Sequence, residues 1–234
     1  MSEPAMIRVA ASNFSERPGF DGVSENHHVS LPSQGILALA DGLGGTTAGR
    51  QAASLACASV VEFLQREARD QEATLPFVLR SYLSLPANVL FNALVHANRR
   101  LLALNADRGV HEKGAASIVA GFVDRQSLAL ASVGSVSAWL EREGRMEELL
   151  RPRTWGRLQD PVRPPPGWMS RIPLSALGVV ADLEPEIIEF RLRPGDRVHI
   201  GTGVSAGIDK VQEFQYDTSE SGVPEKATLT WGFE

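Results

Sequence analysis

The sequence contains a single cysteine, Cys57, so no disulfide can form within the chain. Cys57 lies among small apolar residues in a helical pattern, and free cysteine is one of the most buried residue types, so we expect it in the core rather than as a reactive thiol. No apolar run of about 18 residues that could span a membrane occurs. The first residues lack a basic segment followed by an apolar one, which argues against a secretory signal and predicts a cytoplasmic location.

An excess of positive charge is absent as well. The formal net charge is −5, with 23 Lys and Arg residues against 28 Asp and Glu residues. This balance gives no general attraction to nucleic acid or to an anionic membrane surface, so we expect neither as a partner.

Apolar residues are abundant, at 43% of 234 residues, which is enough for a sizeable core without disulfides. Domains often contain about 100–200 residues, and β-rich domains reach about 250. We therefore expect one domain over residues 1–234.

Two long helices and several short strands are expected from the apolar pattern. Apolar residues at three- and four-residue spacings predict helices over 46–70 and 87–105. Short apolar or alternating runs bounded by turn residues predict strands at 6–12, 34–40, 115–123, 127–133, 136–140, 146–150, 187–192, 197–200 and 227–233. The four strands between 115 and 150 are expected to be antiparallel and joined by tight turns. This order predicts an α+β fold in which helices cover packed antiparallel sheets.

Residues 151–173 contain six prolines and two tryptophans, so a long surface loop with little regular structure is expected there. Trp155 and Trp168 could anchor a partner or pin the loop to the body of the protein, and the sequence leaves both alternatives open.

One acidic residue follows an apolar run in ALADGLGG, residues 38–45. A carboxylate at the end of a buried strand, followed by glycines that let backbone carbonyls approach, is a suitable ligand for Mg²⁺ or Mn²⁺. Asp-Gly pairs also occur in ordinary turns, because Asp bonds its own backbone and Gly tolerates positive φ. The octapeptide alone therefore leaves two roles for Asp41, a metal ligand and a structural turn.

The stretch around Asp41 resembles the signature of the metal-dependent protein phosphatase (PPM) family, type 2C, in which a strand ending in ADGMGG precedes a helix. Further resemblances follow in the family's order along nearly the whole chain. They are KGAAS at 113–117, SLALASVGSVSAWLEREGRMEELL at 127–150, ALG at 176–178, RLRPGDRVHIGTGVSAGI at 191–208 and GVPEKATLTWGF at 222–233.

This resemblance implies both an architecture and a chemistry. The implied fold is a four-layer α-β-β-α sandwich of two packed, mainly antiparallel sheets flanked by helices. Two divalent metal ions at one end of that sandwich would activate a water molecule that attacks phosphoserine or phosphothreonine. Two such cations lower the pKa of the water and neutralise the phosphoryl oxygens, so several carboxylates must converge on them.

Most of the family's charged site positions are altered near the start and in the middle of this sequence. Where the family has a phosphate-binding arginine followed by Asn-Glu-Asp, this chain has Asp21 in place of the arginine and Asn26 in place of the final Asp. The family's Gly-Asp-Ser-Arg is matched by GSVS at 134–137, so Ser135 stands at an Asp position. Neither Ser135 nor its neighbours show the spacing of a serine nucleophile.

The late acidic positions are altered too. Thr202 and Gly203 match the family's Ser-Asp-Gly with the Asp lost, and Glu225 with Lys226 stands where the family has Asp-Asn. The metal ion that the family shares between its first and late aspartates would lose at least one ligand here. The Lys226 ammonium would also compete electrostatically with a cation at that place.

The remaining metal ligands implied by the resemblance are Asp41, the Gly42 carbonyl and Glu25, with Glu225 nearby. Mg²⁺ and Mn²⁺ keep several waters and need few protein ligands. We therefore expect one weakly bound Mn²⁺ or Mg²⁺ at most, in a vestigial site, and we identify no residue as catalytic.

Two adjacent histidines, His27 and His28, follow the altered Asn-Glu-Asp segment. Adjacent residues on a strand point to opposite faces, so at most one of them could face a metal site. The simpler interpretation is that one is packed and the other is exposed.

Three functional hypotheses follow. The first is a pseudophosphatase, a phosphatase-like domain with a degraded two-metal site that acts as a regulatory or binding module in signalling; its expected partner is a protein, such as a phosphoprotein or a component of a kinase pathway. The alternative is an active, divergent Mn²⁺- or Mg²⁺-dependent phosphoserine/phosphothreonine phosphatase that uses Asp41, Glu25 and Glu225 with His27 or Asp209. The third is a vestigial pocket that binds a phosphorylated or nucleotide ligand without turnover.

Overall fold

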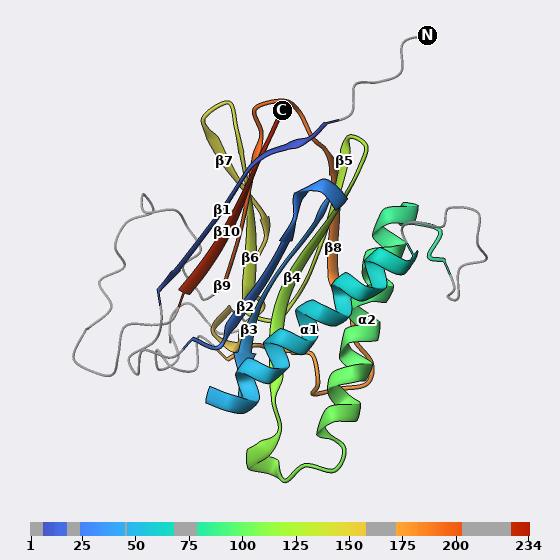
Figure 1. Cartoon of the computed structure of the whole chain (residues 1–234), viewed down its shortest axis with the longest axis vertical. Helices are drawn as coiled ribbons and strands as arrows, with labels where there is room; N and C mark the ends of the chain where they lie inside the picture. The colour runs from blue at the N-terminus through green and yellow to red at the C-terminus, as the bar shows by residue number, and fades with distance from the viewer. Residues whose placement is uncertain (1–6, 18–23, 45, 68–78, 158–171, 203–225) are drawn as a thin grey trace.

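The computed structural model describes residues 7–17, 24–44, 46–67, 79–157, 172–202 and 226–234. These residues form two five-stranded antiparallel sheets that pack face to face, with both α-helices on one of them (Figure 1). The helix-covered sheet has the order β2-β3-β4-β5-β8, with the bounds Asn26–Leu31, Ile36–Leu43, Ala115–Asp124, Ser127–Val133 and Glu186–Arg191. The second sheet has the order β1-β10-β9-β6-β7, with the bounds Val9–Arg17, Lys226–Phe233, Arg197–Thr202, Val136–Arg142 and Arg145–Leu150.

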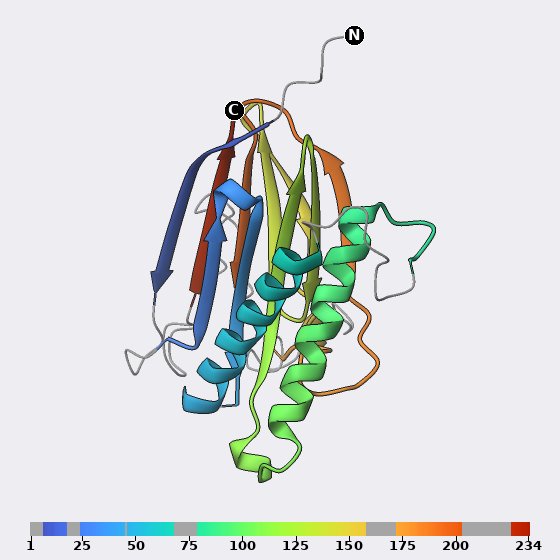
Figure 2. The same cartoon turned by 45° about the vertical axis from the view of Figure 1, so that its right-hand side comes forward.

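The two helices, α1 (Thr46–Glu67) and α2 (Leu85–Asn105), lie side by side across the helix-covered sheet (Figure 2). Several small residues of α1 are fully buried and let the helix approach β3 and β4 closely, among them Ala52, Ala53, Ala56 and Cys57. The start of α2 is fixed by Ser84, whose Oγ accepts a hydrogen bond from the N–H of Ala87 at 3.3 Å, an N-cap that satisfies one of the free donors of the first turn.

Strand β3 is buried on both faces, which explains its uninterrupted apolar sequence. Ala38 and Ala40 contact the helices, whereas Leu37 and Leu39 belong to the core between the two sheets. Side chains alternate along a strand, so the small residues face the close helices and the larger ones fill the wider space between the sheets.

The α+β sandwich predicted from the sequence is confirmed, and the described residues supply three of its expected layers. Both α-helices within them lie on the same sheet, and residues 203–225, between β9 and β10, fall outside the described residues. The prediction that the four strands between residues 115 and 150 are consecutive antiparallel neighbours is wrong between the second and the third strand. Strands β5 and β6 lie in different sheets, because the chain passes from one sheet to the other at Gly134, where φ is +91°. Strand β1 also ends later than expected, at Arg17, because β10 supplies its hydrogen-bond partners.

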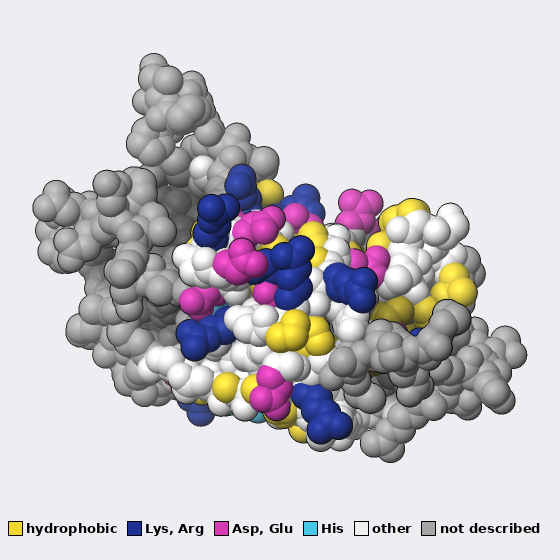
Figure 3. Space-filling view, turned by 90° about the horizontal axis from the view of Figure 1, so that it is seen from above, with side chains coloured by type: hydrophobic (Ala, Val, Ile, Leu, Met, Phe, Trp, Pro, Cys, Tyr) yellow, Lys and Arg dark blue, Asp and Glu magenta, His cyan; other side chains and the backbone are white. Residues whose placement is uncertain are grey.

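The end of the sandwich that carries the β4–β5, β6–β7 and β8–β9 turns is covered with interspersed acidic and basic side chains (Figure 3). One ion pair there has a buried carboxylate: Arg142 donates to both carboxylate oxygens of Asp196, at 2.8 and 2.7 Å, and Asp196 is 1% exposed. The backbone N–H of Arg193 donates to the same carboxylate at 2.7 Å. This paired cluster ties the β8–β9 turn to the end of β6.

Candidate functional site at the end of β3

The first six residues of ALADGLGG, 38–43, form most of β3, and Gly44 follows the strand. Leu39 faces the second sheet and Ala40 faces the helices, so the alternation directs Asp41 toward the space between the sheets and Gly42 toward α1. Asp41 therefore lies near the end of a buried strand, at the end of the sandwich opposite to the charged turns (Figure 1). The strand end expected at residue 40 is wrong, because β4 continues to pair with β3 as far as Leu43.

The glycine after Asp41 is required by the approach of α1. A Cβ at Gly42 would lie 2.8 Å from the Cα of Gly49, and closer still to its carbonyl oxygen. Such a distance to backbone atoms is not found for real Cβ atoms, so any larger residue would push the first turn of α1 away from β3. Gly44 has a different role, because its φ of +122° is a conformation that other residues rarely adopt.

Glu25 directly precedes β2 and lies beside Gly42, but its carboxylate points to α1. The N–H of Gly42 donates to the Glu25 carbonyl at 3.2 Å. A Cβ at Gly49 would lie 2.8 Å from the carboxyl carbon of Glu25, so this carboxylate packs against the first turn of the helix. The structure thus brings Glu25 and Asp41 to neighbouring positions, with their side chains on opposite faces of the sheet.

The neighbours of Asp41 on its own face are an amide and hydroxyl groups. Asn26 is paired with Asp41 on β2, and Ser117 is paired with it on β4. The Oγ of Ser117 accepts from the N–H of Ser135 at 3.1 Å and lies 3.2 Å from its Oγ. Ser135 is 4% exposed and precedes β6, so its contact with Ser117 joins the two sheets. Ser135 stands at the position where the resemblance to the phosphatase family implies an Asp. Ser117 was not singled out from the sequence, and only its pairing with Asp41 reveals it.

The late positions are partly outside the described residues. Thr202 is the last residue of β9, is 1% exposed, and its Oγ1 accepts from the N–H of Ala227 at 3.0 Å. Lys226 begins β10, where its backbone pairs with that of Arg17. The other predicted positions, Asp21, Gly203, Asp209 and Glu225, lie outside the described residues.

The two adjacent histidines occupy opposite faces of β2. His28 faces the second sheet and stacks on Phe14, with ring centroids 3.6 Å apart. His27 shares its face with residues that contact the helices, and its carbonyl accepts a hydrogen bond from the Cys57 thiol at 3.4 Å. Burial lowers the pKa of both imidazoles, so both are neutral at pH 7.

The donors in the described residues do not fit a two-metal centre. No group of three or more His, Cys, Asp or Glu side chains that could hold a metal ion occurs among them. The residues paired with Asp41 on the neighbouring strands are Asn26 and Ser117, and Ser117 bonds to Ser135. Hydroxyl groups and amides leave the charge of two divalent cations uncompensated, so we derive no reaction step through such ions.

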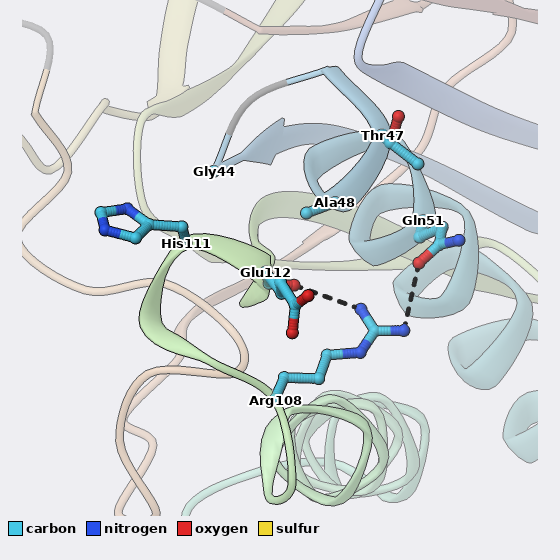
Figure 4. Close-up of a pocket in the computed structure, with 7 residues that line it drawn as sticks. All are labelled: Gly44, Thr47, Ala48, Gln51, Arg108, His111 and Glu112. Carbon is cyan, nitrogen blue, oxygen red and sulfur yellow. Dashed lines mark hydrogen bonds between the residues drawn. The ribbon is translucent and has the colours of Figure 1, made fainter.

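A polar pocket of about 560 Å³ lies at the start of α1, on the other side of Gly44 (Figure 4). Arg108 reaches across it to the Gln51 Oε1 at 3.2 Å and to the Glu112 carbonyl at 3.4 Å. His111 extends away from Arg108, and the Glu112 carboxylate accepts from the N–H of Gly109 at 3.2 Å. The pocket therefore contains one guanidinium whose contacts are made with neutral acceptors.

Two buried asparagines of α2 fix the segments next to this end of the sandwich. Asn98 bonds to Gly178 through its Oδ1 at 2.8 Å and to the carbonyl of Val180 through its Nδ2 at 2.8 Å. Asn105 bonds to both backbone groups of Gly114, at 2.7 and 3.2 Å, and to the carbonyl of Gly178. The sequence signal was a pair of polar residues, seven apart, on the otherwise apolar face of the helix.

The predicted proline-rich loop is described only at its two ends. Trp155 is 48% exposed, and Thr154 forms a bridge with Pro173. Trp168 lies outside the described residues. No helix in the described part of the chain has the length and apolar character that a membrane crossing requires.

Comparison with known proteins identifies relatives of this architecture. The family model described as Protein phosphatase 2C matches residues 23–156, more than half of the chain. No curated protein sequence matches the chain.

Solved structures of bacterial proteins share the fold. PppA of Pseudomonas aeruginosa, described as a key regulatory component of T6SS, has a TM-score of 0.70 at 20% identity over 98% of this chain and 99% of that one. The serine/threonine phosphatase PstP/Ppp of Mycobacterium tuberculosis has a TM-score of 0.71 at 17% identity over 97% and 99%. A structure of the catalytic domain of PstP in complex with two manganese ions has a TM-score of 0.69 at 18% identity over 97% and 98%.

Proposed function

Because this chain belongs to the protein phosphatase 2C family, we propose that it uses the family's scaffold as a regulatory or binding module and hydrolyses phosphate esters poorly or not at all. The observation that supports this proposal is the set of hydroxyl groups opposite Asp41 and at the end of β9. Ser117 and Ser135 bond to each other, and Thr202 bonds to the backbone of β10. A two-metal hydrolase needs carboxylates at such places, because each lost ligand weakens the stabilisation of the transition state.

Under this proposal, Asp41 and Gly42 are retained mainly for structure. Gly42 permits the contact between β3 and α1, and Asp41 lies near the end of the buried strand. One weakly held Mn²⁺ or Mg²⁺ at Asp41 and the Gly42 carbonyl is the most that we expect. If it binds, it would supply a local positive charge.

An active, divergent phosphatase is the second candidate. It is favoured by the backbone hydrogen bond that joins Gly42 to Glu25 and by the manganese ions of the PstP structure. In that case Glu25 would have to turn from α1 toward Asp41, with Glu225, Asp209 or His27 completing the ligands.

The expected partner is a protein, such as a phosphoprotein or a component of a kinase pathway. The description of PppA as a regulatory component supports a regulatory role for the shared scaffold. A cytoplasmic location, an action in signalling and a single domain over residues 1–234 remain predictions.

The test is the initial rate of p-nitrophenyl phosphate hydrolysis as a function of Mn²⁺ concentration. The variants are the native chain, Asp41→Ala and the matched control Asp124→Ala, at the opposite end of the same sheet. We expect no rate above buffer in any of them. A metal-saturable rate that is present in the native chain and in the control, and lost in Asp41→Ala, would establish the second candidate instead.

A binding measurement separates a vestigial metal site from none. If Asp41 holds one ion, Mn²⁺ should raise the melting temperature of the native chain and of Asp124→Ala, but not that of Asp41→Ala, because a ligand stabilises the state that binds it. An equal response in all three proteins would place the ion elsewhere.

A further inference from the structure

An apolar groove of about 890 Å³ lies beside the last turns of α2, next to the polar pocket. Its walls are α2, the start of β4 and the segment 172–179. The residues that line it include Leu102, Ala106, Lys113, Ile172, Leu174 and Val179. Gly44, three residues after Asp41, forms part of the wall of both cavities.

Large apolar side chains are exposed in and beside this groove. Ile172 is 37% exposed and Val179 is 60% exposed, and the adjacent Val180 is 46% exposed. Single exposed apolar residues are common on proteins, but a cluster that lines a hollow is typical of a binding surface.

The groove is held in shape by buried hydrogen bonds. Asn98 and Asn105 fix Gly178 from the side of α2, and Leu177 pairs with Ala116 of β4 through two backbone bonds of 3.1 and 2.9 Å. A surface fixed in this way loses little conformational freedom when a ligand binds, which favours affinity.

The charge of the groove has one sign. Lys113 is exposed and is the only charged residue among the described residues that line the groove. Beyond Gly44, the polar pocket adds the Arg108 guanidinium, while the Glu112 carboxylate is turned to the N–H of Gly109. A ligand with apolar groups along the groove and an acidic group at the end near Lys113 would therefore match it in shape and charge.

We propose that this groove docks a segment of a partner protein in which apolar side chains are followed by acidic ones. The inference rests on the proposed binding function and assigns to it a surface separate from the face of Asp41. A protein segment is favoured as the occupant because the scaffold belongs to a family that acts on proteins.

The test uses short fluorescein-labelled peptides and fluorescence anisotropy on the full chain. The probe has alternate leucines followed by two glutamates; one control peptide has lysines in place of the glutamates, and another has serines in place of the leucines. We expect saturable binding of the first peptide, at least tenfold tighter than that of either control. Equal binding of all three, or none, would overturn the proposal.

Three variants locate the binding. Val179→Asp should weaken the leucine–glutamate peptide at least tenfold, and Lys113→Glu should abolish the preference for glutamates over lysines. Tyr82→Asp, at an apolar residue 78% exposed near the other end of α2, should bind like the native chain. Unchanged melting temperatures would show that the variants fold, since all three side chains are exposed. Native affinity in Val179→Asp would refute the assignment.

The same proteins distinguish a partner segment from a second copy of the chain, and peptide binding from hydrolysis. If the native chain dimerises in sedimentation experiments and Val179→Asp does not, the groove is covered by a second copy, and the proposal of a partner segment fails. A metal-dependent rate with p-nitrophenyl phosphate, which needs no groove, would overturn the proposed lack of hydrolysis and leave the peptide result standing.

Discussion

Replacing Gly42 with alanine tests whether this glycine serves helix packing or metal binding. The added Cβ would meet the Cα of Gly49 at 2.8 Å, whereas ordinary contacts of a Cβ begin at 3.4 Å. The atoms that must move belong to the backbone of α1, whose residues Ala52, Ala53 and Ala56 are fully buried, so the strain passes into the core. Overpacking of this kind costs about 1–3 kcal/mol in the free energy of unfolding.

For a chain of this size, each kcal/mol lowers the melting temperature by about 2–4 °C. We therefore expect Gly42→Ala to melt roughly 4–8 °C below the native chain when followed by circular dichroism at 222 nm, taking about 2 kcal/mol as the cost. The deficit should be the same with EDTA and with Mn²⁺, because the clash does not involve a metal ion.

The matched control is Gly109→Ala. Its φ is −61°, and a Cβ there would have the Glu112 carboxylate oxygen at 3.6 Å as its nearest neighbour. We expect its melting temperature to be unchanged or slightly raised, because alanine restricts the unfolded chain. A native melting temperature for Gly42→Ala, or a deficit that appears only with Mn²⁺, would refute the packing argument.

Three further predictions concern buried polar groups. Burial raises the pKa of the Cys57 thiol to about 12, so Ellman's reagent should not react with the folded chain at pH 8 and should react fully in guanidinium chloride. Asn105→Ala should lower the free energy of unfolding by roughly 2–3 kcal/mol in urea titrations, because it leaves the backbone groups of Gly114 without their partner. Burial alone would raise the pKa of Asp196, but the bonds from Arg142 and from the backbone hold it below its usual value of 3.8. The charged form therefore stabilises the fold above pH 3.8, so Asp196→Asn should cost roughly 2–3 kcal/mol at pH 7, and the difference from the native chain should shrink as the pH falls below 3.8.

The sequence predicted the elements whose pattern depends on local burial. The apolar run before Asp41 indicated a strand buried on both faces, and the small residues of α1 indicated a packed helix, because each pattern reports the immediate neighbours of the element. The strand Asn26–Leu31 is less visible, since it has polar residues on both faces: His27 lies on the helix side, and Ser30 lies on the other side, where its Oγ accepts from the Nε1 of Trp231.

Other features depend on contacts between distant segments, and the sequence could not supply them. At Gly134 the chain passes from β5, which pairs with β8, to β6, which pairs with β9 in the other sheet. These pairings involve strands far along the sequence, so the local turn does not reveal them. The strand before Asp41 was predicted, but its end at Leu43 was not, because it depends on pairing with β4. The direction of the Glu25 carboxylate was not predicted either, because it depends on how closely α1 approaches through Gly49.

The strand order of the second sheet also sets the order in which the molecule can be completed. Strand β1 has β10 as its partner in that sheet, so two segments from opposite ends of the sequence must meet before either is secured. The strands of the helix-covered sheet all lie between residues 26 and 191, so that sheet and its helices can assemble on the ribosome before β10 has been made. Until then β1 lacks its partner in the second sheet, and β9 is paired with β6 on one side and has an open edge on the other. The growing chain can aggregate through that open edge. Synthesis of β10 therefore closes the second sheet, and shortening the chain by this one strand would remove the partner of two others.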